Sequence, residues 1–147
     1  QPQAYPSGDL VVATGVFDLL HIGHLRFLEA AHQLGGRLMV GVESDDRVRR
    51  WKGPDRPIQT QEDRCDLLAA LRIVDAVFVI DGERVDPAFY VDLLRPLGVR
   101  YLAVTADDPF LAAKRESMAG IGVAVRVVIP RIENYSTSRL VRLLGLP

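Results

Sequence analysis

The chain has 147 residues, of which 48% are hydrophobic, and its formal net charge is −1. This length and composition fit one domain with an ordinary core, and the charge gives no sign of bulk affinity for nucleic acid or anionic membranes. The single cysteine, Cys65, can form neither an internal disulfide nor a cysteine-rich metal site. No apolar run approaches the roughly 18 residues that cross a bilayer. We therefore expect a cytoplasmic protein that binds neither nucleic acid nor membranes.

The first nine residues differ in composition from the rest of the chain. They are mostly polar, include two prolines and lack the hydrophobic stretch of a signal peptide. We expect residues 1–9 to form a flexible lead-in and residues 10–147 to form one domain.

Short apolar runs alternate with segments of helical periodicity along the domain. In the first helical segment, apolar residues recur every three positions from Leu25 to Leu34, and the two glycines that follow should end the helix. The charged stretch 45–60 contains two prolines and is expected to be a long surface loop. The apolar runs predict strands at 10–13, 38–42, 76–80, 99–104 and 123–129. The periodic segments predict helices at 23–34, 61–72, 87–94, 110–119 and 136–144.

This alternation predicts an α/β fold with a five-stranded parallel sheet. Because crossovers between parallel strands are right-handed, helices should cover both faces, as in a doubly wound, Rossmann-like domain. Ligands bind such sheets beyond the carboxyl ends of the strands. The segments where a site is expected are therefore 14–24, 43–52, 81–84, 105–109 and 130–138.

The segment after the first strand carries two histidines at the start of a helix. His21 and His24 are three residues apart, so their rings can converge near the unpaired N–H groups and the positive end of the helix dipole. Gly15 would let the backbone approach a phosphate, and Gly23 would leave room for a nucleotide. The pattern predicts a polyphosphate site, and the missing G-x-G-x-x-G fingerprint argues against a dehydrogenase. Zinc binding by the pair and simple packing are the alternatives.

The segment before the last helix is also suited to phosphate. Ser136 and Thr137 lie where the last strand gives way to the last helix, so their hydroxyls can cap the helix and contact phosphate oxygens. Arg131 adds a fixed positive charge with bidentate donors. The alternative is an ordinary helix cap beside a surface arginine.

These two segments resemble the signatures of one enzyme family, the cytidylyltransferase-like nucleotidyltransferases. The second signature of that family is similar to residues 130–138, with Asn134 in place of a glycine, and Arg64 matches the E-x-R-x-x-x-L helix start of many members. The resemblance covers nearly the whole chain, and it implies transfer of a nucleoside monophosphate from an NTP with release of pyrophosphate. The H-x-G-H element of the family is similar to Gly15-x-Phe17-Asp18-x-x-His21-x-Gly23-His24.

The resemblance also implies roles for single residues. Asp18 could bind the acceptor or orient the histidine loop, and Ala106 replaces a family glycine, which weakens the match near the base. Catalytic contacts with the triphosphate are implied for His21, His24, Lys52 and Arg131. Nucleotide contacts are implied for Thr14, Gly15, Phe17, Gly23, Asp107, Ser136 and Thr137. Acceptor contacts are implied for Asp18, Arg64 and Asp108.

The expected reaction needs little from the protein beyond positioning and charge. A phosphate monoester is already anionic near neutral pH, so its oxygen can attack the α-phosphorus without a general base. We expect Mg²⁺ as the cofactor, held mainly by phosphate oxygens and water rather than by protein ligands. As in many relatives, a homodimer is expected.

Different parts of the chain resemble relatives that use different substrates. Residues 52–75 are similar to the adenylyltransferase domain of ADP-heptose synthases, which use ATP and a heptose 1-phosphate. Asp107, Asp108 and Arg131-x-Glu133 look more like cytidylyltransferases for glycerol 3-phosphate or phosphoethanolamine, which use CTP. Our prediction is a sugar-phosphate adenylyltransferase. A cytidylyltransferase, including one for a phosphonate, and a non-catalytic nucleotide-binding regulatory module are the alternatives.

Overall fold

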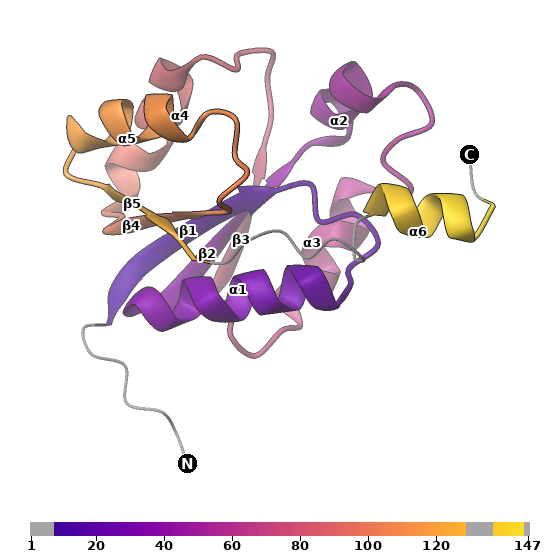
Figure 1. Ribbon diagram of the computed structural model, residues 1–147, viewed down its shortest axis with the longest axis horizontal. Coiled ribbons are helices and arrows are strands. Elements are labelled where there is room, and N and C mark those ends of the chain that lie inside the picture. The colour runs from indigo at the N-terminus through magenta and orange to yellow at the C-terminus, as the bar shows by residue number, and fades with distance from the viewer. Residues whose placement is uncertain (1–7, 129–136, 146–147) are drawn as a thin grey trace.

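Within the residues that the structure describes, 8–128 and 137–145, five parallel strands form one sheet in the order β3-β2-β1-β4-β5 (Figure 1). The structure is a computed structural model. The pairings β1 with β2 and β4, β2 with β3, and β4 with β5 are all parallel. The predicted α/β fold is therefore confirmed. The strands are β1 (Asp9–Gly15), β2 (Gly36–Glu43), β3 (Ala76–Ile80), β4 (Tyr101–Val104) and β5 (Ala124–Val127).

Helices cover both faces of the sheet, as a doubly wound fold requires (Figure 1). One face packs against α1 (Ile22–Gly35) and α3 (Gln61–Ala69), and the opposite face packs against α4 (Pro87–Leu94) and α5 (Leu111–Ala119). A short 3₁₀ turn (Arg95–Leu97) extends α4. None of the helices in the described ranges is long and apolar enough to cross a membrane.

The central strand β1 shows why the strands are apolar on both sides. Its residues point alternately to opposite faces of the sheet. Val11 and Ala13 belong to the core beneath α1 and α3, whereas Leu10 and Val12 belong to the core beneath α4 and α5. Because neither face meets water, the strand reads as a continuous apolar run rather than an alternating one.

The direction of the chain places the ligand end of the sheet. The first crossovers lead from β1 outward to β2 and β3, and the later ones lead to β4 and β5 on the other side. The order of the strands therefore reverses between β1 and β4, and the residues that follow these two strands diverge from each other. Ligand sites in open parallel sheets lie at such a switch point.

The expected surface loop at 45–60 is wrong in its first half, because residues 45–52 form the helix α2 (Asp45–Lys52). The Ser44 side chain caps this helix by accepting a hydrogen bond from the backbone N–H of Arg47. Acidic residues occupy its first turn and basic residues its last, which favours the helix dipole. The helix lacks a wide apolar stripe, which is why periodicity missed it.

Several element boundaries differ slightly from the predictions. β1 begins at Asp9 and extends through Gly15, so it includes residues assigned to the lead-in and to the following turn. α3 ends at Ala69, three residues early. Helix α6 (Thr137–Leu143) begins where the described residues resume, and residues 129–136 lie outside the described part of the chain. The switch from α1 to β2 at Gly35 and Gly36 agrees with the sequence.

The tightest backbone approach at this switch gives a test of the fold. A Cβ at Gly35 would lie 2.3 Å from the backbone oxygen of Asp9, so α1 could not keep its place against β1. We expect Gly35→Ala to lower the free energy of unfolding by about 1–3 kcal/mol, the usual cost of overpacking, in urea denaturation. Gly120→Ala is the control, because a Cβ there meets its nearest atom at an ordinary 3.5 Å. Equal stability of the two variants would contradict this packing.

Candidate active site

The two histidines of the H-x-G-H segment form the start of α1. His21 is the N-cap, and its Nδ1 accepts a hydrogen bond from the backbone N–H of Gly23 at 3.1 Å. The Nδ1 of His24 accepts one from the backbone N–H of His21 at 3.2 Å. The two rings stack with their centroids 3.8 Å apart, so they converge as their spacing predicts. The backbone of the helix start thus fixes both rings.

These contacts decide which ring nitrogens carry protons. A neutral imidazole has one nitrogen that donates and one that accepts. Because Nδ1 accepts a backbone N–H in both His21 and His24, the proton of each neutral ring is on Nε2. Each ring can therefore offer an Nε2–H donor to an anionic oxygen without itself carrying a charge.

The surroundings keep these rings neutral. The pKa of His24 falls from 6.5 to about 3, mainly because burial disfavours the charged form and also because His21 and the ammonium of Lys52 are near. Burial lowers the pKa of His21 as well. Positive charge at this site therefore comes from Lys52 and the helix dipole rather than from the imidazoles.

The loop that leads into α1 has an unusual backbone. Phe17 and Leu19 both have positive φ, 53° and 48°, which costs energy for residues other than glycine. The buried ring of Phe17 packs edge-on against His24, with centroids 5.5 Å apart. A Cβ at Gly15 would meet this ring at 3.1 Å, so Gly15 makes room for Phe17 beneath the histidine. The loop thus holds the ring of His24 in place through its contact with Phe17.

Asp18 holds this loop to a distant part of the chain. Its buried carboxylate accepts hydrogen bonds from the backbone N–H groups of Ile58 at 2.7 Å and Gln59 at 3.0 Å. The Gln59 side chain in turn accepts a hydrogen bond from the backbone N–H of Leu19 at 3.0 Å. The hydroxyl of Thr137 donates to the backbone oxygen of Asp18, which joins α6 to the same loop. Of the two roles considered for Asp18, these contacts support orientation of the histidine loop.

Arg64 lies inside the protein, with none of its surface exposed. Its guanidinium donates to the backbone oxygens of Val16, Glu43 and Gln59 and to the carboxylate of Asp45 at 2.8 Å. These contacts join the ends of β1 and β2 to the segment before α3. The expected contact of Arg64 with the acceptor therefore does not agree with this geometry, and the residue instead positions the strand ends.

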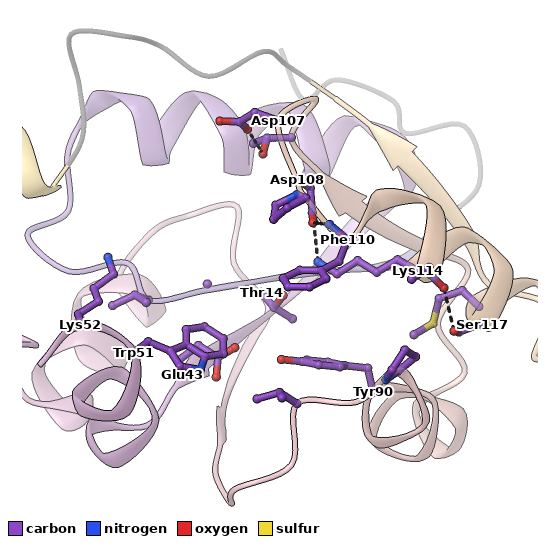
Figure 2. Close-up of a pocket in the computed structure, with 18 residues that line it drawn as sticks. Thr14, Glu43, Trp51, Lys52, Tyr90, Asp107, Asp108, Phe110, Lys114 and Ser117 are labelled. Carbon is purple, nitrogen blue, oxygen red and sulfur yellow. Dashed lines mark hydrogen bonds and ion pairs between the residues drawn. The ribbon is translucent and has the colours of Figure 1, made fainter.

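A cavity of about 840 Å³ opens at the switch point, next to the histidine loop (Figure 2). The end of β1 and the residues that follow β4 line part of it, α2 contributes Trp51 and Lys52, and α4 and α5 contribute further lining residues. Figure 2 shows Lys52 at one end and Ser117 at the other. The lining contains the predicted residues Thr14, Gly15, Lys52, Asp107 and Asp108.

Glu43, which lines the cavity, belongs to a buried charge pair with Arg47. The carboxylate of Glu43 accepts a hydrogen bond from Nε of Arg47, and Arg47 also donates to the hydroxyl of Tyr90 at 2.9 Å. The remaining bonds of Arg47 go to the backbone oxygens of Gly82 at 2.9 Å and Arg84 at 2.8 Å. Burial raises the pKa of Glu43, although Arg47 opposes the shift. These four hydrogen bonds fix the Arg47 side chain, which in turn holds Glu43 and Tyr90 in the cavity lining.

The aspartates after β4 have different contacts. Asp107 accepts a hydrogen bond from the Thr105 hydroxyl at 2.7 Å and is exposed at the cavity. Asp108 accepts one from the backbone N–H of Phe110 at 2.8 Å and forms an ion pair with Lys114 at 2.5 Å. Asp107 is therefore placed to contact a ligand, whereas Asp108 starts the turn into α5.

Sequence reasoning missed part of this lining. Glu43, the last residue of β2, and Trp51 both lie inside the segment 43–52 where a site was expected, but neither was singled out. Tyr90 and Lys114 belong to segments read only for their helical periodicity. Arg131 and Ser136 lie outside the described residues. Across residues 8–128 and 137–145, the structure contains no grouping of three His, Cys, Asp or Glu side chains that could hold a metal ion.

Comparison with known proteins identifies the family. A family model described as cytidylyltransferase-like matches residues 12–143. The chain belongs to the cytidylyltransferase-like family. It is 36% identical over 136 residues to the bifunctional protein HldE of Methylobacillus flagellatus, and 39% identical over 134 residues to that of Coxiella burnetii. These alignments cover 92% and 90% of this chain but 27% of each relative, so the chain spans about a quarter of their length. Family and relatives make it a nucleotidyltransferase.

Solved structures agree on the fold. The lipopolysaccharide core biosynthesis protein of Thermoplasma volcanium superimposes with a TM-score of 0.65 at 28% identity, covering 84% of this chain and 96% of that one. The pantothenate synthetase of Thermus thermophilus has a TM-score of 0.60 at 21% identity, covering 89% of this chain and 59% of that one. The second likeness is at the level of the fold.

The anchoring role of Asp18 can be tested by stability. In Asp18→Asn, the amide NH₂ would face one of the backbone N–H groups of Ile58 and Gln59, which leaves a buried donor unsatisfied. We expect the free energy of unfolding to fall by about 1–3 kcal/mol in urea denaturation. Asp55→Asn, an exposed aspartate of the same segment, is the control and should be unchanged. A neutral result for Asp18→Asn would remove the anchoring role.

The neutrality of His24 predicts a pH effect. The folded protein holds the pKa of His24 at about 3, below its value of 6.5 without the fold, so the unfolded chain binds more protons between these pH values. Stability should therefore fall as pH drops from 6.5 towards 3, and less so in His24→Gln. NMR of the imidazole nitrogens should show His24 neutral and protonated on Nε2 at pH 5. A His24 ring that titrates near pH 6.5 would contradict this.

Proposed function

We propose that this chain transfers AMP from ATP to a sugar phosphate and releases pyrophosphate. The observation that carries the proposal is the pair of neutral histidines at the start of α1, with Nε2–H donors beside the ammonium of Lys52. A triphosphate needs donors and positive charge at one place, and a helix N-terminus with such neighbours supplies both.

The relatives support the choice of acceptor. The bifunctional protein HldE and the lipopolysaccharide core biosynthesis protein match most of this chain, and lipopolysaccharide cores are built from sugars. Both likenesses agree with the similarity of residues 52–75 to the adenylyltransferase domain of ADP-heptose synthases. The complete activity of HldE belongs to a longer protein, so we propose for this chain the nucleotidyl transfer alone.

In the proposed reaction, an oxygen of the acceptor phosphate attacks the α-phosphorus of ATP. The new P–O bond forms as the bond to the bridging oxygen breaks, and pyrophosphate leaves with that electron pair. His21 and His24 donate from Nε2 to the phosphate oxygens, and Lys52 neutralises charge that develops on the leaving group. Mg²⁺ bound with ATP would supply further positive charge to the phosphates, and we assign no protein ligand to it.

A cytidylyltransferase is the second candidate. The description of the matching family model as cytidylyltransferase-like favours it, and the exposed carboxylate of Asp107 beside the cavity can accept a hydrogen bond from the amino group of cytosine. The adenine amino group can donate in the same way, so the nucleotide assay below decides between the two.

The decisive experiment measures pyrophosphate release with Mg²⁺. ATP and CTP are each combined with sugar 1-phosphates, glycerol 3-phosphate and phosphoethanolamine. We expect release with ATP and a sugar phosphate, and His24→Ala should lower kcat/KM by about 100-fold or more, as for loss of a transition-state donor. Arg26→Ala, an exposed arginine on the same helix, is the control. Nucleotide binding without release in any combination would favour a non-catalytic regulatory module.

A further inference from the structure

The cavity beyond Lys52 has a lining that the phosphates do not explain. Trp51, Val85 and Phe110 are large apolar side chains, yet 54%, 57% and 66% of their surfaces are exposed. They come from three separate segments, and all three line the same cavity. Figure 2 shows Trp51, Tyr90 and Phe110 around one hollow. Apolar side chains exposed around a concave site indicate a ligand with an apolar surface.

The charges of the cavity show how such a ligand would be oriented. Lys52 lies at the end next to the histidines, where a phosphate is favoured. The carboxylate of Glu43 lies further along, and its charge is balanced by its ion pair with Arg47. This part of the cavity therefore offers no net charge to either an anionic or a cationic group of a ligand. The body of the ligand should therefore be neutral.

The hydrogen-bonding groups here suit hydroxyls. A carboxylate can accept about four hydrogen bonds, and Glu43 has one from Arg47 and one from the hydroxyl of Tyr90. The remaining positions can accept from hydroxyl groups of a ligand. The guanidinium of Arg47 also lies 5.7 Å from the centre of the Trp51 ring, which helps to hold that ring in place. A ligand in this cavity thus meets the Glu43 carboxylate, which can accept hydrogen bonds from its hydroxyls, and the fixed ring of Trp51.

We infer that this cavity is the acceptor subsite and that Trp51 and Glu43 select a neutral, ring-shaped polyol phosphate. The apolar face of the ring packs on Trp51, its hydroxyls donate to Glu43, and its phosphate lies towards Lys52. This inference rests on the proposed function. It adds which residues discriminate the acceptor, and it predicts that small acyclic acceptors bind poorly because they lack an apolar ring face to pack on Trp51.

Binding without turnover is the first test. Trp51 is the only tryptophan in the sequence, so intrinsic fluorescence reports directly on this wall. With no ATP present, heptose 1-phosphate or mannose 1-phosphate should change the emission, and glycerol 3-phosphate at the same concentration should not. Because no reaction is needed, a fluorescence response remains informative even if pyrophosphate release fails. Equal responses to the ring and acyclic phosphates, or no response to any of them, would overturn the inference.

Variants then separate packing from other effects. By calorimetry, Trp51→Ala should weaken binding of the sugar phosphate about fivefold, and Trp51→Phe should retain most of it, because a second aromatic ring restores the contact. Leu67→Ala is the matched control, since Leu67 is 43% exposed on α3 and does not line the cavity. In turnover, the KM for the sugar phosphate should rise with little change in kcat. A rise in the KM for ATP instead would assign this wall to the nucleotide.

A uronic acid provides the test of Glu43. Glucuronic acid 1-phosphate has the ring of glucose 1-phosphate but carries a carboxylate in place of a hydroxymethyl group. The added carboxylate would lose hydration beside Glu43, whose counter-charge, Arg47, is already committed to four hydrogen bonds, so its binding should weaken about tenfold relative to glucose 1-phosphate. Equal affinity for the two would show that Glu43 does not face the acceptor.

Discussion

The carboxylate of Asp18 fixes the geometry on which the site depends. It accepts backbone hydrogen bonds from Ile58 and Gln59, about 40 positions along the chain, while its own backbone oxygen accepts from Thr137. The histidine loop, the segment after α2 and the start of α6 are thereby held at one point. A buried carboxylate is stable only when its oxygens are hydrogen bonded, so these segments must come together for the loop to form.

Two buried arginines extend this principle to the rest of the cavity. Arg64 links the ends of β1 and β2 to the segment before α3, and Arg47 links α2 to the loop after β3 and to α4. A buried guanidinium is costly unless its donors are satisfied, and nearly all of these are. The two buried arginines therefore hold the ends of strands against neighbouring segments. Lys52 and Trp51, on the same helix as Arg47, are presented to ligands in consequence.

The two stacked histidine rings avoid mutual repulsion because both are neutral. Charged imidazoles stacked 3.8 Å apart would repel each other, and burial disfavours charge on both. Neutral rings with Nε2–H donors avoid that repulsion and still offer hydrogen bonds to anionic oxygens. The positive charge of the site then comes from the helix start and from the exposed side chain of Lys52. The surroundings that lower the pKa of His24 thus leave the ring neutral, with a donor on Nε2, at physiological pH.

The sequence by itself determined the layered fold and the centre of the site. Apolar runs alternating with periodic segments require a parallel sheet covered on both faces, and His21 and His24 are local to one helix start, so spacing alone was sufficient. Lys52 and Asp107 were singled out through the resemblance of their segments to the family, and both line the cavity. These features depend on residues that are close together in the chain.

Only the tertiary structure decided which polar residues are buried and what they hold. Arg47 was not singled out in the sequence, Arg64 was assigned to the acceptor rather than to the interior, and α2 was expected to be a loop. The partners of these residues are chosen by packing across 20 to 50 positions. The assembly of Glu43, Trp51 and Tyr90 around one cavity has the same origin. Hydrogen bonds between distant segments produce no periodic pattern in the sequence. They can therefore be identified only in the folded structure, where the strand ends lie together.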